Sequence, residues 1–255
     1  MIKGAVFDAL RGGKSVVTAN KALIAEYLEE IVALVDEVNG NSNSSSSKGG
    51  VKFGYEASVC GGIPIIHTLQ SSYKGDIINE ISGICNGTTN FMLGKMMDEG
   101  AEYDTVLKEA QDLGYAEADP TADVEGHDVR AKIAILAKLA FGVTVPITQI
   151  PCKGITEISV VDFAYAKSMG CTIKLVGTAV RQSQFGEHDG ALSVYVSPKL
   201  VPLDHLLAGA TGCGNAVAVD SANLGTASYT GPGAGRYATA NSVVADVMRV
   251  ANGTC

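Results

Sequence analysis

Residues 14–38, KSVVTANKALIAEYLEEIVALVDEV, predict the fold class of this 255-residue chain. The β-branched run at 14–19 is typical of a buried parallel strand, and Asn20 can cap a helix that begins at Lys21. Apolar residues then recur at helical spacing as far as Val38. A strand that leads directly into such a helix is one unit of a doubly wound α/β fold, so we expect an α/β protein.

The remaining segments indicate a second, α+β part. The run NGNSNSSSSKGG at 39–50 is polar and of low complexity, and it interrupts the α/β pattern without ending it. Further helices are predicted at 3–10, 89–98, 103–113, 124–141, near 162–169 and at 238–251, and a loop that starts a helix at 62–69. Strands are predicted at 51–56, 77–84, 155–161, 172–180, 191–198 and 215–220. The later strands favour a mixed, mainly antiparallel sheet backed by helices.

Composition excludes several function classes. The net charge is −8 and no basic stripe is present, so a nucleic-acid partner is not expected, because phosphate neutralisation requires clustered lysines and arginines. No apolar run reaches the ~18 residues of a membrane span. Six cysteines lie far apart without a C-x-x-C pair, which favours reduced thiols in a cytoplasmic protein.

The first candidate site lies where an acid-rich loop meets a predicted helix. Asp128 and Lys132 stand four residues apart on one helix face. With Asp128, the segment 115–125 brings five carboxylates together, which requires a cationic ligand group, a metal or the lysine as compensation. An amino-bearing substrate fits this requirement. The alternative is an ordinary exposed ion pair, which contributes little.

Three loops supply further candidates. Lys21 follows a predicted parallel strand, at the edge where open α/β sheets bind ligands, although it can equally be a solvated first-turn lysine. The segment CNGTTN at 85–90 either holds a ligand oxygen at a helix N-terminus or is a simple turn and cap. The segment GPGAG at 231–235 allows a close backbone approach in a cleft.

Seven ordered motifs together resemble homoserine dehydrogenase. They are VVTANKALIA (16–25), YEASVCGGIPII (55–66), NGTTNFML (86–93), GYAEADPTADVEGHDVRAKIAILAKLAFG (114–142), IKLVGTAV (173–180), VPLDHLLAGATGCGNAVAV (201–219) and GPGAGRYATANSVVADV (231–247). The resemblance implies NAD(P)-dependent interconversion of L-aspartate 4-semialdehyde and L-homoserine, in threonine, methionine and isoleucine biosynthesis. It also implies a homodimer and a structural sodium ion.

The resemblance assigns roles to individual residues. Asp128, Lys132 and Lys21 match the catalytic positions. The substrate-binding positions are Glu117, Gly87, Thr88 and Asp123, and the cofactor-binding positions are Thr18, Asn20, Lys21, Gly233 and Gly235. The sodium positions are Glu56 and the carbonyls of Val59, Gly61 and Ile63.

One departure from the family bears on domain organisation. The family begins with a strand and a G-x-G-x-x-G turn, which this sequence lacks, so we expect an N-terminally incomplete chain. Residues 1–57 are then the remnant of an NAD(P)-binding Rossmann domain, 58–228 a catalytic and dimerisation domain, and 229–255 a helix that returns to the first domain. An inactive fragment with only a dimerisation role is the alternative function, and a plastid form without its transit peptide is the alternative location.

Overall fold

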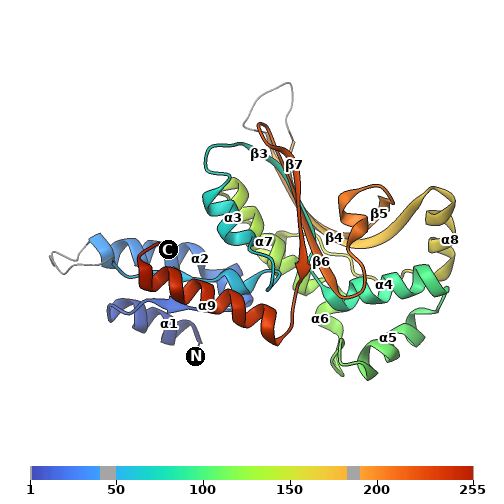
Figure 1. The fold of residues 1–255 in the computed structure, drawn as a ribbon, viewed down its shortest axis with the longest axis horizontal. Coiled ribbons are helices and arrows are strands. Elements are labelled where there is room, and N and C mark those ends of the chain that lie inside the picture. The colour runs from blue at the N-terminus through green and yellow to red at the C-terminus, as the bar shows by residue number, and fades with distance from the viewer. Residues whose placement is uncertain (1, 41–49, 183–189, 255) are drawn as a thin grey trace.

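The fold is described from a computed structural model that covers residues 2–40, 50–182 and 190–254. Most of the serine-rich run predicted at 39–50 therefore lies outside the described residues. Figure 1 shows the N-terminal elements and the C-terminal helix gathered on one side and a larger sheet with its helices on the other.

The N-terminal elements form a small parallel unit. In chain order they are α1 (Ile2–Arg11), β1 (Val16–Val17), α2 (Lys21–Gly40) and β2 (Phe53–Gly54). β1 and β2 pair in parallel through Val16 with Phe53 and Val17 with Gly54. The apolar stripe of α2 is buried, including Ile24 and Ile31. The predicted strand–helix unit is confirmed, although both strands are shorter than expected.

A five-stranded sheet forms the second part. Its strands are β3 (Ile78–Ile84), β4 (Cys171–Arg181), β5 (Leu192–Pro202), β6 (Gly214–Ser221) and β7 (Gly225–Pro232). Their order is β5-β4-β3-β6-β7, and every neighbouring pair is antiparallel. The prediction of a mainly antiparallel sheet backed by helices is confirmed.

Helices cover this sheet and connect it to the N-terminal unit. They are α3 (Ile65–Ser71), α4 (Gly87–Glu99), α5 (Tyr103–Asp112), α6 (Thr121–Val124), α7 (His127–Phe141), α8 (Val160–Ser168) and α9 (Arg236–Asn252), with 3-10 turns η1 (Glu56–Ser58), η2 (Ile147–Gln149) and η3 (Leu206–Gly209). α7 packs on β3, β4 and β5, whereas α4 packs on β4 and β6. α9 leaves β7 and packs against η1, β2 and β1, and Figure 1 shows it running from β7 back to the side of the molecule that holds the N-terminal elements.

One sequence prediction before α8 is wrong, and one at α7 is correct except for where the helix begins. The segment 155–161 is not a strand, because the Asp162 carboxylate accepts hydrogen bonds from the amide and hydroxyl of Ser159 and starts α8 there. The helix predicted at 124–141 is confirmed as α7, which ends at Phe141 but begins three residues later than expected, because Gly126 adopts a φ of 79° between α6 and α7. A left-handed residue cannot continue a right-handed helix.

Two more differences concern strands. The strand predicted at 51–56 ends at Gly54, because the Glu56 amide donates instead to the carboxylate of Asp246 on α9. β7 is absent from the prediction, since GTASYTGP at 225–232 shows no apolar alternation. It lies at the sheet edge and pairs with β6 alone.

Across the described ranges, no helix has the length and apolar content that a membrane span requires.

Candidate active site

A pocket of about 640 Å³ lies between the two parts of the molecule. Its lining comes from segments far apart in sequence, because Lys21 begins α2, Asp128 and Lys132 lie on α7, and Gly233 follows β7. The first two residues of α4, Gly87 and Thr88, also line it. The predicted catalytic residues and part of the predicted substrate-binding set therefore share one cavity.

Asp128 is the centre of the charged cluster in this pocket. Its side chain is 4% exposed, and Oδ2 lies 2.7 Å from Nζ of Lys132. Oδ1 lies 2.5 Å from Nζ of Lys21, which is 45% exposed. Oδ1 nevertheless has no partner in hydrogen-bond geometry among the described residues, so Lys21 and Asp128 form an ion pair without a well-directed hydrogen bond. The pair predicted as catalytic is buried, unlike an ordinary surface pair.

The electrostatics of the site favour the charged forms of Asp128 and Lys132. Burial by itself would raise the pKa of Asp128, but the charge and hydrogen bond of Lys132, the hydrogen bond of Asn86 and the charge of Lys21 lower it to about 2. Burial opposes the charged form of Lys132, but the Asp128 carboxylate outweighs it and raises the pKa of that lysine. Lys132 is thus a protonated ammonium at neutral pH and can act as a proton donor.

Asn86 fixes the position of the acidic groups. As the residue that caps α4, it accepts the Thr89 amide hydrogen at 2.9 Å. Its side-chain amide donates to Asp128 at 3.0 Å and to Asp123 at 2.7 Å. No ion pair joins Asp123 to a lysine or arginine in the part of the chain that the structure describes. Asp123 is therefore a carboxylate in the pocket whose charge is uncompensated.

The glycine loop after β7 permits a close approach to the pocket. A Cβ on Gly233 would lie 1.9 Å from Nδ2 of Asn215, and Gly235 has a φ of 109°. Both positions therefore require glycine. Both glycines line the pocket, and the cofactor-binding role that the family resemblance assigns to them stays a prediction.

Three predicted residues lie outside the lining of this pocket. Glu117 is exposed, and its carbonyl accepts a hydrogen bond from Gln111. Thr18 and Asn20 serve the start of α2, because the Thr18 hydroxyl accepts the Asn20 amide hydrogen and the Asn20 side chain accepts that of Leu23. Their predicted roles in binding substrate and cofactor stay predictions.

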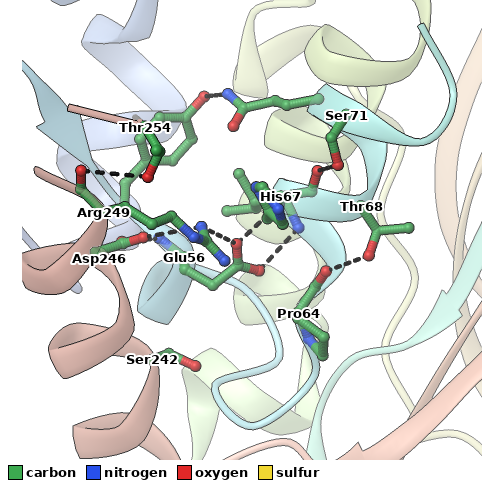
Figure 2. Close-up of polar contacts among 12 residues, drawn as sticks. Glu56, Pro64, His67, Thr68, Ser71, Ser242, Asp246, Arg249 and Thr254 are labelled. Carbon is green, nitrogen blue, oxygen red and sulfur yellow. Dashed lines mark hydrogen bonds and ion pairs between the residues drawn. The ribbon is translucent and has the colours of Figure 1, made fainter. Parts of the chain in front are cut away.

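The predicted sodium residues surround the turn between η1 and α3. The two Glu56 oxygens accept the amides of Ile66 and His67 at 2.9 and 2.8 Å, and Arg249 lies 3.7 Å away (Figure 2). The carbonyl of Gly61 accepts the Ser242 hydroxyl at 2.6 Å. All four predicted donors are oxygens, as sodium prefers, but Glu56 already has partners that offset its charge.

Sequence reasoning missed functional groups that only the fold brings together. Asn86 was part of a recognised turn, but its bridge between Asp123 and Asp128 depends on α6 packing against both α4 and α7. The Cys85 carbonyl accepts a hydrogen bond from Lys132 at 2.6 Å. A backbone acceptor leaves no residue-type signal, so sequence could not identify it.

The fold, a parallel α/β unit joined to an antiparallel sheet, is shared with solved structures of dehydrogenases. The family model for homoserine dehydrogenase matches residues 64–248. The chain belongs to the homoserine dehydrogenase family, as the motifs in the sequence indicate.

Relatives and solved structures agree with this assignment. The chain is 45% identical to the homoserine dehydrogenase of Bacillus subtilis over 244 residues, which are 95% of this chain and 52% of that protein. A crystal structure of homoserine dehydrogenase from Thiobacillus denitrificans has a TM-score of 0.88 and 41% identity, covering 98% of this chain and 54% of that one. A hyperthermophilic archaeal homoserine dehydrogenase in complex with NADPH has a TM-score of 0.79 and 29% identity, covering 98% and 68%. The chain thus spans about half the length of the curated relatives it matches.

Proposed function

We propose that the chain carries the substrate site of a homoserine dehydrogenase, which interconverts L-aspartate 4-semialdehyde and L-homoserine. The observation that supports the proposal most directly is the buried Asp128 carboxylate, which lies between Lys21 and Lys132 in the pocket of about 640 Å³. An NAD(P) cofactor, which the NADPH complex of the archaeal relative supports, supplies the hydride when bound.

The residues of this chain would manage the proton and the substrate. Two N–H groups of Lys132 are engaged by Cys85 and Asp128, so its remaining N–H can donate to the carbonyl oxygen of the semialdehyde. As the alkoxide develops, the nearby ammonium stabilises it and supplies its proton. Asp128 orients Lys132, and Lys21 on the cofactor side is a second proton donor.

Asp123 is suited to the ammonium group of the amino-acid substrate. The Asp123 carboxylate lines the pocket and forms no ion pair with a lysine among the described residues, whereas the Asp128 carboxylate pairs with both Lys21 and Lys132. Gly87 and Thr88 begin α4 beside it and would take the substrate carboxylate at the helix N-terminus. Glu117 completes the substrate set that family resemblance assigns.

Calorimetry with L-homoserine tests this assignment. The chain should bind homoserine, and the D123N variant should bind it at least tenfold more weakly, since loss of the charge removes the ammonium partner. D119N is the matched control, because Asp119 is an exposed acid in the same loop. Its carboxylate accepts a hydrogen bond from the Thr121 amide. Equal affinity of D123N and the parent chain would contradict the role of Asp123.

We also propose a homodimer formed through the face of the five-stranded sheet that carries Tyr195 of β5 and Ser228 of β7. Val194 and Val196 of β5 are buried, whereas the alternating Ser193, Tyr195 and Ser197 are only half-buried. On the same face, the Ser228 hydroxyl of β7 is buried without a partner among the described residues. Sedimentation of the parent chain should give a dimer, and S228R should weaken it at least tenfold. A monomeric parent chain would contradict this proposal.

A structural sodium ion is proposed at Glu56 and the carbonyls of Val59, Gly61 and Ile63. The all-oxygen donor set supports it. The thermal midpoint should be higher in sodium chloride than in choline chloride at equal ionic strength, and E56Q should remove the difference. Equal midpoints for the parent chain would count against the site.

A cytoplasmic location remains a proposal from cysteine usage and is tested by imaging a fluorescent fusion in the native cell.

A further inference from the structure

Lys174 of β4 is a buried cation that the proposed chemistry does not use. The residue is 4% exposed, and no carboxylate forms an ion pair with it within the described ranges. Its Nζ donates instead to Oδ1 of Asn90 at 2.8 Å and to the carbonyl of Ala210 at 2.8 Å. Burial lowers the pKa of Lys174. Lysine is almost never buried without an opposite charge, so this placement requires an explanation.

Asn90 of α4 extends the same network. It is 1% exposed, and its Nδ2 lies 3.1 Å from the carbonyl of Ala210, 3.0 Å from that of Gly212 and 2.9 Å from that of Gly214. One amide group thus holds three carbonyls of the segment between η3 and β6. Lys174 in turn fixes the orientation of that amide by donating to its oxygen.

Residues 210–214, which Asn90 and Lys174 hold, border the pocket that contains Asp128 and Lys132. Cys213 and Gly214 line the pocket, as do Gly87 and Thr88. The contact is close, because a Cβ on Gly87 would lie 2.9 Å from the carbonyl oxygen of Cys213. A shift of residues 210–214 would therefore change the width of the pocket at the proposed substrate-binding positions.

We propose that Lys174 and Asn90 form a buried clamp that holds residues 210–214 in place. This segment would form the substrate-facing side of the pocket that contains Asp128 and Lys132. Lys174 is then a positioning residue for the amino-acid substrate. This inference rests on the proposed function for its effect on substrate binding, but not for its effect on the segment itself.

Three variants separate a hydrogen-bonding role from a packing role. K174M keeps the length of the side chain and removes its donors, whereas K174Q is shorter and keeps two N–H donors. If Lys174 only fills space, K174M is the milder change; if it acts as a clamp, K174Q is. N90A removes the side-chain amide of Asn90 but leaves the hydrogen bond from Lys174 to the carbonyl of Ala210. It serves as the second variant should K174M fail to fold. K199M is the control, because Lys199 is a half-buried lysine of the same sheet that donates to Thr178 and Tyr195.

Hydrogen–deuterium exchange measures the clamp directly. Amides of residues 211–215 should exchange at least tenfold faster in K174M and N90A, less so in K174Q, and at the parent rate in K199M. Calorimetry should show homoserine affinity at least tenfold lower in K174M. In a turnover assay the change should appear in KM, with kcat within about threefold of the parent.

The outcomes distinguish the two proposals. Unchanged exchange at 211–215 in both K174M and N90A overturns the clamp, as does K174M being milder than K174Q. If the parent chain does not bind homoserine, the proposed function fails, and the exchange rates alone then decide the clamp. Faster exchange with unaltered homoserine affinity overturns the positioning role.

Discussion

At the scale of a single residue, Asp128 connects the charged groups of the pocket. Its two oxygens face different lysines, one on its own helix and one at the start of α2, and Asn86 holds it from the side. Removing any one partner would leave a buried charge less compensated, which is costly. The arrangement thus fixes Lys132 before substrate arrives.

The pKa of Asp128 predicts how stability depends on pH. Its pKa is lowered from 3.8 to about 2, so ionisation stabilises the folded state by roughly 2 kcal/mol. This contribution is complete above pH ~4 and is lost as the pH falls from about 4 to about 2. In D128N it should be absent, so urea unfolding of the variant between pH 6 and pH 3 should show a smaller loss of stability than the parent chain. Parallel curves would contradict the low pKa.

Lys21 is the more exposed of the two lysines and should act on the reaction more than on binding. In K21A, kcat should fall at least tenfold while KM stays within about threefold, because its proposed interaction is made with the transition state. Steady-state kinetics with aspartate 4-semialdehyde measure both. A rise in KM with unchanged kcat would instead make Lys21 a binding residue.

The packing of α7 on the sheet determines, at the scale of elements, where Asp128 and Lys132 lie. Gly177 of β4 faces this helix, and a Cβ there would lie 2.9 Å from Cγ1 of Val129 and 3.1 Å from Cβ of Ile133. The absence of a side chain lets the helix sit close to the strand.

G177A should therefore lower the free energy of unfolding by about 1–3 kcal/mol, the usual effect of overpacking. G94A is the matched control: Gly94 lies within α4, and a Cβ there has open space. It should stabilise by about 0.5–1 kcal/mol, since alanine favours helix. Chemical denaturation measures both. If G177A proves as stable as the parent chain, the close packing of α7 on β4 is incorrect.

Helices were easier to predict than strands because a buried stripe repeats over several turns. α2 and α7 follow such patterns, whereas β7 at the sheet edge carries few apolar residues and gave no signal. The strand expected at 155–161 shows the converse error. Ile155 is apolar because it is buried in a loop, and apolar content alone does not separate a buried loop from a strand.

At the scale of the whole molecule, the pocket forms only when the two ends of the chain meet. α9 packs on β1 and β2, which places the glycine loop at 231–235 near Lys21. Family resemblance located Lys21, Asp123, Asp128 and Lys132, and the structure gathers them. The clamp at Asn90 and Lys174 could not be predicted, because its acceptors are backbone carbonyls of a segment far along the chain.

Turnover of aspartate 4-semialdehyde with NADPH is the most direct test of the central claim that Lys132 is the proton donor of a homoserine dehydrogenase. K132A should lower kcat at least 100-fold. K138A, which alters a lysine on the same helix that pairs with Glu29, should keep the parent rate. Absence of NADPH oxidation by the parent chain, or a K132A rate within a few-fold of the parent, would contradict the account.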